Sequence, residues 1–508
     1  MTHLLTAQVG PLTPIDTPDV EYSGMLPALV LIGGAMVLLV VVATTRRRPP
    51  WLWTGIAVAA GVTALAASLW LWADVRDDGA RRIVADALVV DGFSAFFMVL
   101  VSVTVILGAL LAGGYLEREG FEGPEFHVLM LLSASGGVVM ASANDLIVLF
   151  LGLEILSIAL YVMAGFDGRR LESREAAMKY FVLGAFSSAL FLYGVALVYG
   201  ATGSTNLAQV RAFLASNLAP GNGVLLAGMA LLLVGLGFKV AVVPFHTWTP
   251  DVYQGAPTPA TGFMAAAAKA AGFAGLLRVF YSTFSTLQVD WRPVVWALAV
   301  VTLLVGSVLA VVQTDIKRML AYSSISHAGY VLIGLQAATD KGVAGSLFYL
   351  LAYTFMVLGS FAVVTVVGRR GDADHDLSAY RGLAARRPAL AFAFTVFLLA
   401  QAGVPFTTGF LAKFYVISAA VEAESYALGL IGMLAAVVAA FFYLRITVLM
   451  YAQPAGAPAA DGAPDPARRL PVPMTTGVVV TAAVAFTVAF GVIPSPMVEF
   501  ARDATLLL

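Results

Sequence analysis

The sequence contains no cysteine and little charge. None of its 508 residues is cysteine, which excludes disulfides, thiol chemistry and iron–sulfur ligation by cysteine within the chain. Charged residues make up 12% and hydrophobic residues 60%, against about 25% and roughly 45–50% in soluble domains. A net charge of −1 excludes a basic protein that binds nucleic acid. So few polar residues could not cover a soluble protein of this length, and the composition predicts a membrane protein in contact with the lipid bilayer.

Motifs of soluble catalysis are also missing. The sequence has no phosphate-binding loop, no dinucleotide fingerprint, no metal-spaced histidine cluster and no nucleophile elbow. We therefore do not expect this chain to hydrolyse ATP or to hold a metal. Any work that it performs must be driven by an ion gradient or by a partner.

Long apolar runs are what the sequence does have. Runs of about 20 residues, the length that spans a bilayer, predict an all-α polytopic protein with about fourteen transmembrane helices. They lie near 24–45, 51–73, 92–116, 126–142, 144–166, 174–200, 223–245, 257–284, 293–313, 318–338, 343–368, 388–421, 425–451 and 473–493. The twelfth run contains Gly403, Val404 and Pro405 and is too long for one straight span, so we expect two half-helices there. The Ala/Pro/Gly-rich segment 452–473 predicts an aqueous linker.

Lysine and arginine are distributed unevenly between the loops. Loops after odd-numbered helices hold sixteen of the 29 cationic residues and the opposite loops hold seven. This excess places the odd-numbered loops, including 452–473, in the cytoplasm and both termini on the extracytoplasmic side. Near a helix end, Arg278 is expected to be an interfacial anchor. The six cationic residues left within spans are Lys179, Lys239, Lys269, Arg278, Lys413 and Arg445.

The middle of the chain contains an internal repeat. Blocks 126–284 and 293–451 each have five spans, and an odd number of spans forces the second block to be inverted. The fourth helix of each block carries the tripeptide Val-Pro-Phe, at 243–245 and 404–406. Helix breaks at matching positions indicate an inverted-repeat transporter. We expect three helices in 1–125, one broken helix in each repeat, and the linker and last helix in 452–508.

Four charged residues lie deep within predicted spans: Glu154, Lys239, Lys269 and Lys413. A charge at the bilayer centre costs about 2.5–3.5 kcal/mol even on the lenient insertion scale. These residues could be static pairs that pin helices together, or they could form a proton relay. Lysine changes its pKa readily on burial, and three separated lysines with one glutamate favour the relay.

The predicted breaks supply polar groups beside these charges. Pro244 and Pro405 leave backbone carbonyls without donors, which in a membrane require water or protein partners. His246 would help to hold water there. The alternative for Pro244 is a plain kink.

Three further residues within the spans are candidates for supporting roles, and two of them have two readings each. His327 could carry protons near neutral pH or hydrogen-bond a neighbouring helix; in the inverted alignment it falls opposite Glu154. Arg445 falls opposite Lys269 in the same alignment. Lys179 could tune Glu154 or extend its amine to the interface.

Four segments resemble a known family. KVAVVPFHTWTPDVYQGAPTP at 239–259, DIKRMLAYSSISHAGY at 315–330 and GFLAKF at 409–414 resemble the antiporter-like subunits of respiratory complex I. The segment KYFVLGAFSSA at 179–189 is similar to subunit N of bacterial NADH-quinone oxidoreductase. The similarity spans about 120–450. Lys413, where subunit M typically has glutamate, and the chain's end soon after the fourteenth helix, unlike subunit L, also favour subunit N.

The resemblance implies a non-redox subunit of a proton-pumping translocase in the bacterial plasma (inner) membrane. Glu154 and Lys239 would form the first pair of its relay, Lys269 the centre and Lys413 the outlet. FMN, iron–sulfur clusters and quinone would be bound by partner subunits of the peripheral and membrane arms. The alternatives are a cation/proton antiporter subunit and a structural spacer with immobile charges.

Overall fold

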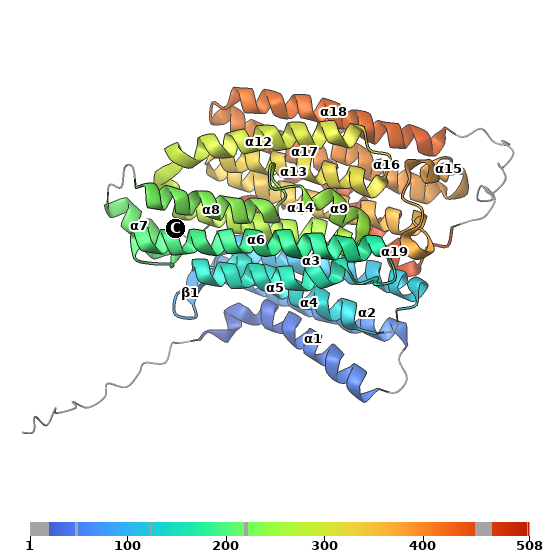
Figure 1. The fold of residues 1–508 in the computed structure, drawn as a ribbon, viewed down its shortest axis with the longest axis horizontal. Coiled ribbons are helices and arrows are strands. Elements are labelled where there is room, and N and C mark those ends of the chain that lie inside the picture. Colours follow the sequence, from blue (N-terminus) through green and yellow to red (C-terminus); the bar gives the residue numbers. More distant parts are fainter. Residues whose placement is uncertain are drawn as a thin grey trace, which may run out of the picture.

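The structure is a computed structural model that describes residues 20–45, 49–121, 123–217, 222–452, 470–504 and 506. Its long helices run side by side (Figure 1). Most of the predicted linker, at 453–469, lies outside the described residues.

The elements follow one another in the order that the hydrophobic pattern predicts. The N-terminal part consists of η1 (Tyr22–Met25), α1 (Leu26–Thr44), α2 (Pro50–Asp78), the antiparallel strands β1 (Arg81–Ile83) and β2 (Leu88–Val90), and α3 (Gly92–Glu119). The next part consists of α4 (Glu125–Ser142), α5 (Leu146–Ala164), α6 (Leu171–Thr202), α7 (Leu207–Ser216), α8 (Gly223–Lys239), α9 (Trp248–Gly255), α10 (Thr258–Phe263), η2 (Met264–Ala268), α11 (Lys269–Leu276), η3 (Leu277–Thr283) and η4 (Ser285–Leu287). The last part consists of α12 (Gln288–Val311), α13 (Ile316–Ala337), α14 (Asp340–Val367), η5 (Arg370–Asp372), η6 (Leu377–Tyr380), α15 (Leu383–Arg386), α16 (Pro388–Ala402), α17 (Thr408–Glu422), α18 (Tyr426–Tyr451), α19 (Met474–Val492) and α20 (Ser495–Asp503).

All fourteen predicted spans are present. Among the described residues, eleven helices are long and apolar enough to cross a membrane unaided. The other three spans are α13 and the two broken pairs α8/α9 and α16/α17. The sequence therefore predicts the all-α polytopic fold correctly.

The twelfth span is broken where expected. Gly403 ends α16 with a φ of 94°, a left-handed conformation that glycine adopts without steric cost. Thr407 then begins α17, and its side chain accepts a hydrogen bond from the Phe410 N–H. Val404 and Phe406 between the half-helices are 38% and 76% exposed, whereas α19 packs against the Phe406 carbonyl, since a Cβ added at Gly491 would clash with its oxygen.

The seventh span is also broken, as expected for the first repeat, but its break begins before the predicted end of the span. The helix was expected to continue to residue 245, but α8 ends at Lys239 and a second half-helix, α9, follows at 248. Backbone groups freed by this break find partners on neighbouring elements: the Val243 N–H donates to Thr302 Oγ1 (3.1 Å), and Trp248 Nε1 donates to the Phe238 carbonyl (3.0 Å). Pro244 thus lies in an unwound segment and not in a kinked helix.

A pair of backbone hydrogen bonds forms a bridge at the start of α5, and the same bridge occurs again at the start of α13, at positions shifted by a constant number of residues. Leu146 N donates to Thr205 O, and Leu207 N donates to Asn144 O. The same two bonds are made by Ile316 N to His375 O and by Leu377 N to Thr314 O. Each of the four positions is shifted by 170 residues, and Asp145 and Asp315 are the N-caps of α5 and α13.

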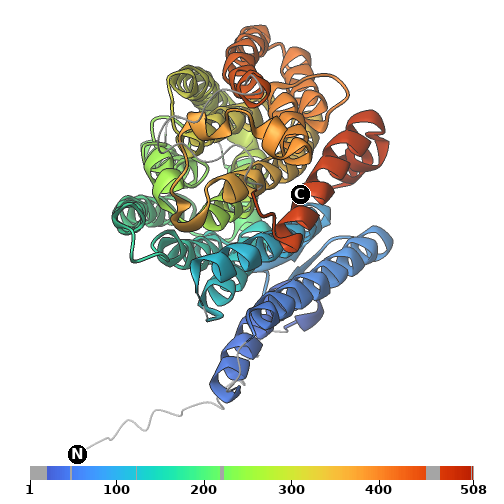
Figure 2. The same cartoon turned by 90° about the vertical axis from the view of Figure 1, so that its right-hand side faces the viewer.

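The N-terminal helices form an outlying layer. Figure 2, in which the helices are seen end-on, shows α1 and α2 (blue) to one side of the other helices. Glu21 pairs with Arg81 (2.8 Å) and Asp503 with Arg76 (3.5 Å). Both ends of the described chain therefore lie on the same side of the bundle, near the C-terminal end of α2.

Candidate functional site

Three lysines are buried in the middle of the bundle. Lys239 is the last residue of α8, Lys269 begins α11 directly after the π-helical turn η2, and Lys413 lies in α17. Their exposed fractions are 4%, 3% and 6%. A π-helical turn inside a helix is rare and is often found at functional sites.

Each of these three lysines lies close to a buried tyrosine ring. The Nζ atoms of Lys239, Lys269 and Lys413 are 5.5, 5.9 and 4.9 Å from ring centroids, within the range of cation–π attraction. The sequence prediction missed these tyrosines, because an aromatic residue within an apolar run gives no distinct signal. The three rings belong to Tyr180, Tyr353 and Tyr330, respectively.

Lys239 is joined to α5 and α6 by hydroxyl groups. Its Nζ donates to Ser157 Oγ (2.9 Å) and to Tyr180 OH (3.2 Å). Glu154, one turn before Ser157, accepts a short hydrogen bond from Ser188 Oγ. Among the described residues no ion pair joins Glu154 to Lys239, so the two expected partners are linked through α5 and are not in direct contact.

Lys269 contacts α13. Its Nζ donates to the Ser324 carbonyl (2.6 Å) and to Ser324 Oγ (2.5 Å). The stem of Lys239 lies against the next turn of α11, because a Cβ added at Gly272 would be 3.3 Å from Lys239 Cγ. In the described part of the chain no hydrogen bond joins the two lysines directly.

A series of polar groups leads from Ser324 toward Lys413. The adjacent Ser323 Oγ shares a short hydrogen bond with Tyr443 OH, which lies 3.5 Å from Gln401 Oε1. Lys413 Nζ donates to the carbonyls of Gln401 and Ala402, each at 2.8 Å. Those carbonyls are left free where α16 ends, and a cation is favoured at the negative end of a helix.

His327 lies beside this series. Its Nδ1 is 2.7 Å from Tyr349 OH and its Nε2 is 3.2 Å from Tyr443 OH. The shift of 170 residues between the backbone bridges pairs Ser157 with His327 and Glu154 with Ser324. The expected alignment of His327 with Glu154 is therefore off by about one helical turn.

Lys179 is not beside Glu154. Its side chain is 41% exposed and pairs with Glu175 (2.6 Å) and with Asp251 of α9 (2.7 Å). The other carboxylate oxygen of Asp251 pairs with Arg318 (2.7 Å). Asp251 was missed as a candidate although it lies within the motif at 239–259.

The other candidates lie at different places. His246 is half-buried in the first break, where its Nδ1 has no partner among the described residues. Arg445 is exposed and donates to the Val311 carbonyl (3.2 Å), so it does not face the buried lysines. Arg278 is not an interfacial anchor but is 4% exposed and makes two 2.9 Å bonds to Asp91. Its helix is covered on all sides by other helices, which the sequence does not reveal.

Fold and site together define a class: polytopic membrane proteins of the antiporter type, with buried lysines beside two broken helices. Residues 143–439 match the family described as NADH:quinone oxidoreductase/Mrp antiporter, TM. NADH-quinone oxidoreductase subunit N of Trichlorobacter lovleyi is 44% identical, covering 84% of this chain and 85% of the relative. The subunit N of Rhodococcus opacus is 40% identical over 97% of both chains. The chain belongs to the NADH-quinone oxidoreductase subunit N family.

Solved structures agree with this assignment. A chain of respiratory complex I from Thermus thermophilus is 33% identical, with a TM-score of 0.76, covering 93% of this chain and 98% of that one. A chain of the Mrp complex from Dietzia sp. has a TM-score of 0.82 at 22% identity, covers 95% of this chain and 96% of that one, and shares the fold. No group of three or more His, Asp or Glu side chains suited to a metal occurs among the described residues.

Proposed function

We propose that this chain is a membrane-arm subunit of an NADH:quinone oxidoreductase and that it moves protons across the membrane. The polar series from Lys269 to Lys413 carries this proposal, because the hydroxyl groups of Ser324, Ser323 and Tyr443, which can accept and donate protons, lie between the two buried lysines. Because the chain belongs to the subunit N family, we take electron transfer from NADH to quinone as the energy source for this proton movement. Electron transfer from NADH to quinone takes place in partner subunits of the same complex.

The residues take separate roles in this proposal. Glu154 and Lys239 form the first pair, with Ser157 and Tyr180 between their helices, and Lys269 is the central group. Lys413 is the outlet. Moving one proton against about 200 mV requires roughly 4.6 kcal/mol, which corresponds to pKa changes of about three to four units along the path.

Redox chemistry is assigned to the partners. The chain contains no cysteine, and the resemblance assigns FMN, iron–sulfur clusters and quinone to other membrane-arm and peripheral-arm subunits. This chain then acts as a non-redox subunit of the translocase. Its contribution is the proton path and the helices that can open or close it.

Two inverted repeats, at 126–284 and 293–451, organise the path. The support is the pair of backbone bridges shifted by 170 residues and one broken helix in each block. Residues 1–125 add three helices, and 452–508 add the linker and the last helix. The excess of Lys and Arg in the odd-numbered loops orients the chain in a bacterial plasma membrane with both termini outside.

The test is proton uptake by membrane vesicles that contain the assembled complex. Lys269→Met removes the central amine, and we expect it to abolish most quinone-linked proton uptake while NADH oxidation with an artificial acceptor continues. The control is Lys341→Met, since Lys341 is exposed and pairs with Glu422 at 2.7 Å. Normal uptake in Lys269→Met would refute the relay. Gradient-driven cation exchange by the chain without the NADH-oxidising arm would favour an antiporter subunit instead.

A further inference from the structure

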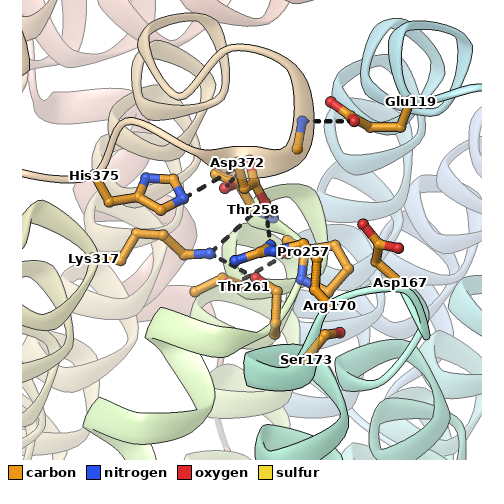
Figure 3. Close-up of polar contacts among 12 residues, drawn as sticks. Glu119, Asp167, Arg170, Ser173, Pro257, Thr258, Thr261, Lys317, Asp372 and His375 are labelled. Carbon is orange, nitrogen blue, oxygen red and sulfur yellow. Dashed lines mark hydrogen bonds and ion pairs between the residues drawn. The ribbon is translucent and has the colours of Figure 1, made fainter.

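Asp372 lies where the ends of several helices meet, in the connection between α14 and α15. Figure 3 shows Lys317, Arg170 and Thr258 converging on it. Its carboxylate accepts hydrogen bonds from Thr258 N (3.2 Å), Thr258 Oγ1 (3.1 Å), Tyr115 OH (3.2 Å) and Arg170 Nη1 (3.4 Å). Lys317 Nζ lies 4.0 Å away, and both side chains of this pair are fully buried.

The groups around Asp372 stand at the starts of helices that carry the buried lysines and their partners. Thr258 begins α10, which leads through η2 to Lys269. Lys317 is the second residue of α13, the helix that presents Ser324 to Lys269. Arg170 is the N-cap of α6, which carries the tyrosine beside Lys239.

Asp372 is a fixed charge. Burial alone would raise the pKa of its carboxyl, but the charges of Lys317, Arg170 and Arg118 outweigh that effect and hold the pKa below its ordinary value. Burial also lowers the pKa of His375 to about 3, so the imidazole is neutral near pH 7. A carboxylate that stays ionised suits a tether between helices and not a proton carrier.

Other carboxylates nearby are engaged elsewhere. Glu119 pairs with Arg118 Nε (2.9 Å) and accepts from Gly371 N (2.7 Å), and Asp167 pairs with Arg169 (2.8 Å). Among the described residues, Asp372 is therefore the carboxylate in ion-pair range of Lys317. Removing it would leave a buried cation uncompensated, which is costly.

We infer that Asp372 is a positioning residue for the proposed relay, because, together with the bond from Lys317 Nζ to the Ala256 carbonyl (2.6 Å), it ties the starts of α10 and α13 together and so holds Lys269 against Ser324. Lys269 lies about 16 Å along its helix from Thr258, and Ser324 lies about 10 Å along α13 from Lys317. A slip of one residue, about 1.5 Å, would stretch and misalign the 2.5 and 2.6 Å bonds of Lys269, and hydrogen bonds weaken as their angle departs from linear. This inference rests on the proposed function.

The first experiment replaces Asp372 in the whole complex. We expect Asp372→Asn to lower quinone-linked proton uptake per assembled complex at least ten-fold, and Asp372→Glu to restore part of it. The matched control is Asp374→Asn in the same loop, where Asp374 makes a half-exposed pair with Arg369 (3.2 Å), and it should retain full uptake. Normal uptake in Asp372→Asn overturns the inference.

A double variant separates positioning from general support of the fold. If Asp372 acts by holding Lys269 against Ser324, adding Ser324→Ala to Asp372→Asn should cause little further loss, whereas independent effects multiply. Multiplied losses overturn the inference. If Asp372→Asn fails to assemble, the charge-balanced Asp372→Asn/Lys317→Met variant replaces it: assembly with lost uptake supports positioning, and assembly with normal uptake overturns it.

The same series distinguishes this inference from the proposed function. Normal uptake in both Lys269→Met and Ser324→Ala would refute the relay itself. Loss of uptake in Lys269→Met with normal uptake in Asp372→Asn would refute the positioning role alone.

Discussion

Replacing Gly403 with alanine should displace the side chain of Lys413, the proposed outlet. Gly403 has a φ of 94°, and an added Cβ would lie 3.0 Å from Lys413 Cδ and 3.5 Å from its Nζ. The left-handed backbone costs alanine about 1–2 kcal/mol. The lysine must also move, because its stem is the group that the new methyl meets.

The second cost can be estimated from the bonds of Lys413. Its Nζ donates to two carbonyls at 2.8 Å, and a hydrogen bond from a charged group contributes about 1.5–3 kcal/mol. At 3.0 Å the lysine stem must shift by a few tenths of an ångström, and a shift that breaks one of these bonds would change the population of the native arrangement roughly ten- to hundred-fold. We expect proton uptake to fall at least ten-fold in Gly403→Ala.

Gly203→Ala is the matched control. Gly203 ends α6 with a φ of 76°, and a Cβ there would meet nothing within 4 Å. Both variants should lower the heat resistance of the assembled complex, measured on native gels after heating, by similar amounts. Only Gly403→Ala should lose quinone-linked proton uptake in vesicles. Equal uptake in the two variants would refute the assignment of Lys413 to the path.

Two further predictions test charge and orientation. Lys413→Arg keeps the donors and the charge but not the ability to release a proton, since arginine stays protonated; we expect impaired uptake, and normal uptake would indicate a static tie to the end of α16. The absence of cysteine allows single-cysteine labelling of intact cells with a membrane-impermeant maleimide. The maleimide should label Asp290→Cys, which is predicted to lie outside, in intact cells. It should label Asp374→Cys, which is predicted to lie in the cytoplasm, only after the membrane is permeabilised, and the reverse pattern would contradict the predicted orientation.

The transmembrane helices could be predicted because the bilayer imposes a length and a composition on each span. The second break could also be predicted, since Gly403 and Pro405 interrupt an apolar run that is too long for one helix. The half-helix α9 could not, because its sequence is polar and short and it is held by packing against α6 and α13. The terminal helix α20 was missed because its sequence is likewise short and polar.

The candidate site was predictable only at its charged residues. A lysine or glutamate within an apolar span stands out, so Glu154 and the three buried lysines were found. Their partners were not, because Ser324, Tyr443 and the other hydroxyl groups are ordinary residues of membrane helices. Tertiary packing decides which helix face meets which, and it also turned Arg278 inward to Asp91.

The unwound backbone at 404–406 limits the conditions under which this chain is stable. Fifteen helical residues flank it on each side, in α16 and α17, so it lies deep within the thickness of the bilayer. Irregular backbone is not tolerated against hydrocarbon; the Val404 carbonyl is bonded to Thr407 Oγ1 and α19 covers that of Phe406, but both residues remain exposed at the surface of the chain. A copy of this chain made in excess of its partner subunits would expose this segment to lipid and would be less stable. Its cellular amount should therefore follow the supply of those subunits and not its own rate of synthesis.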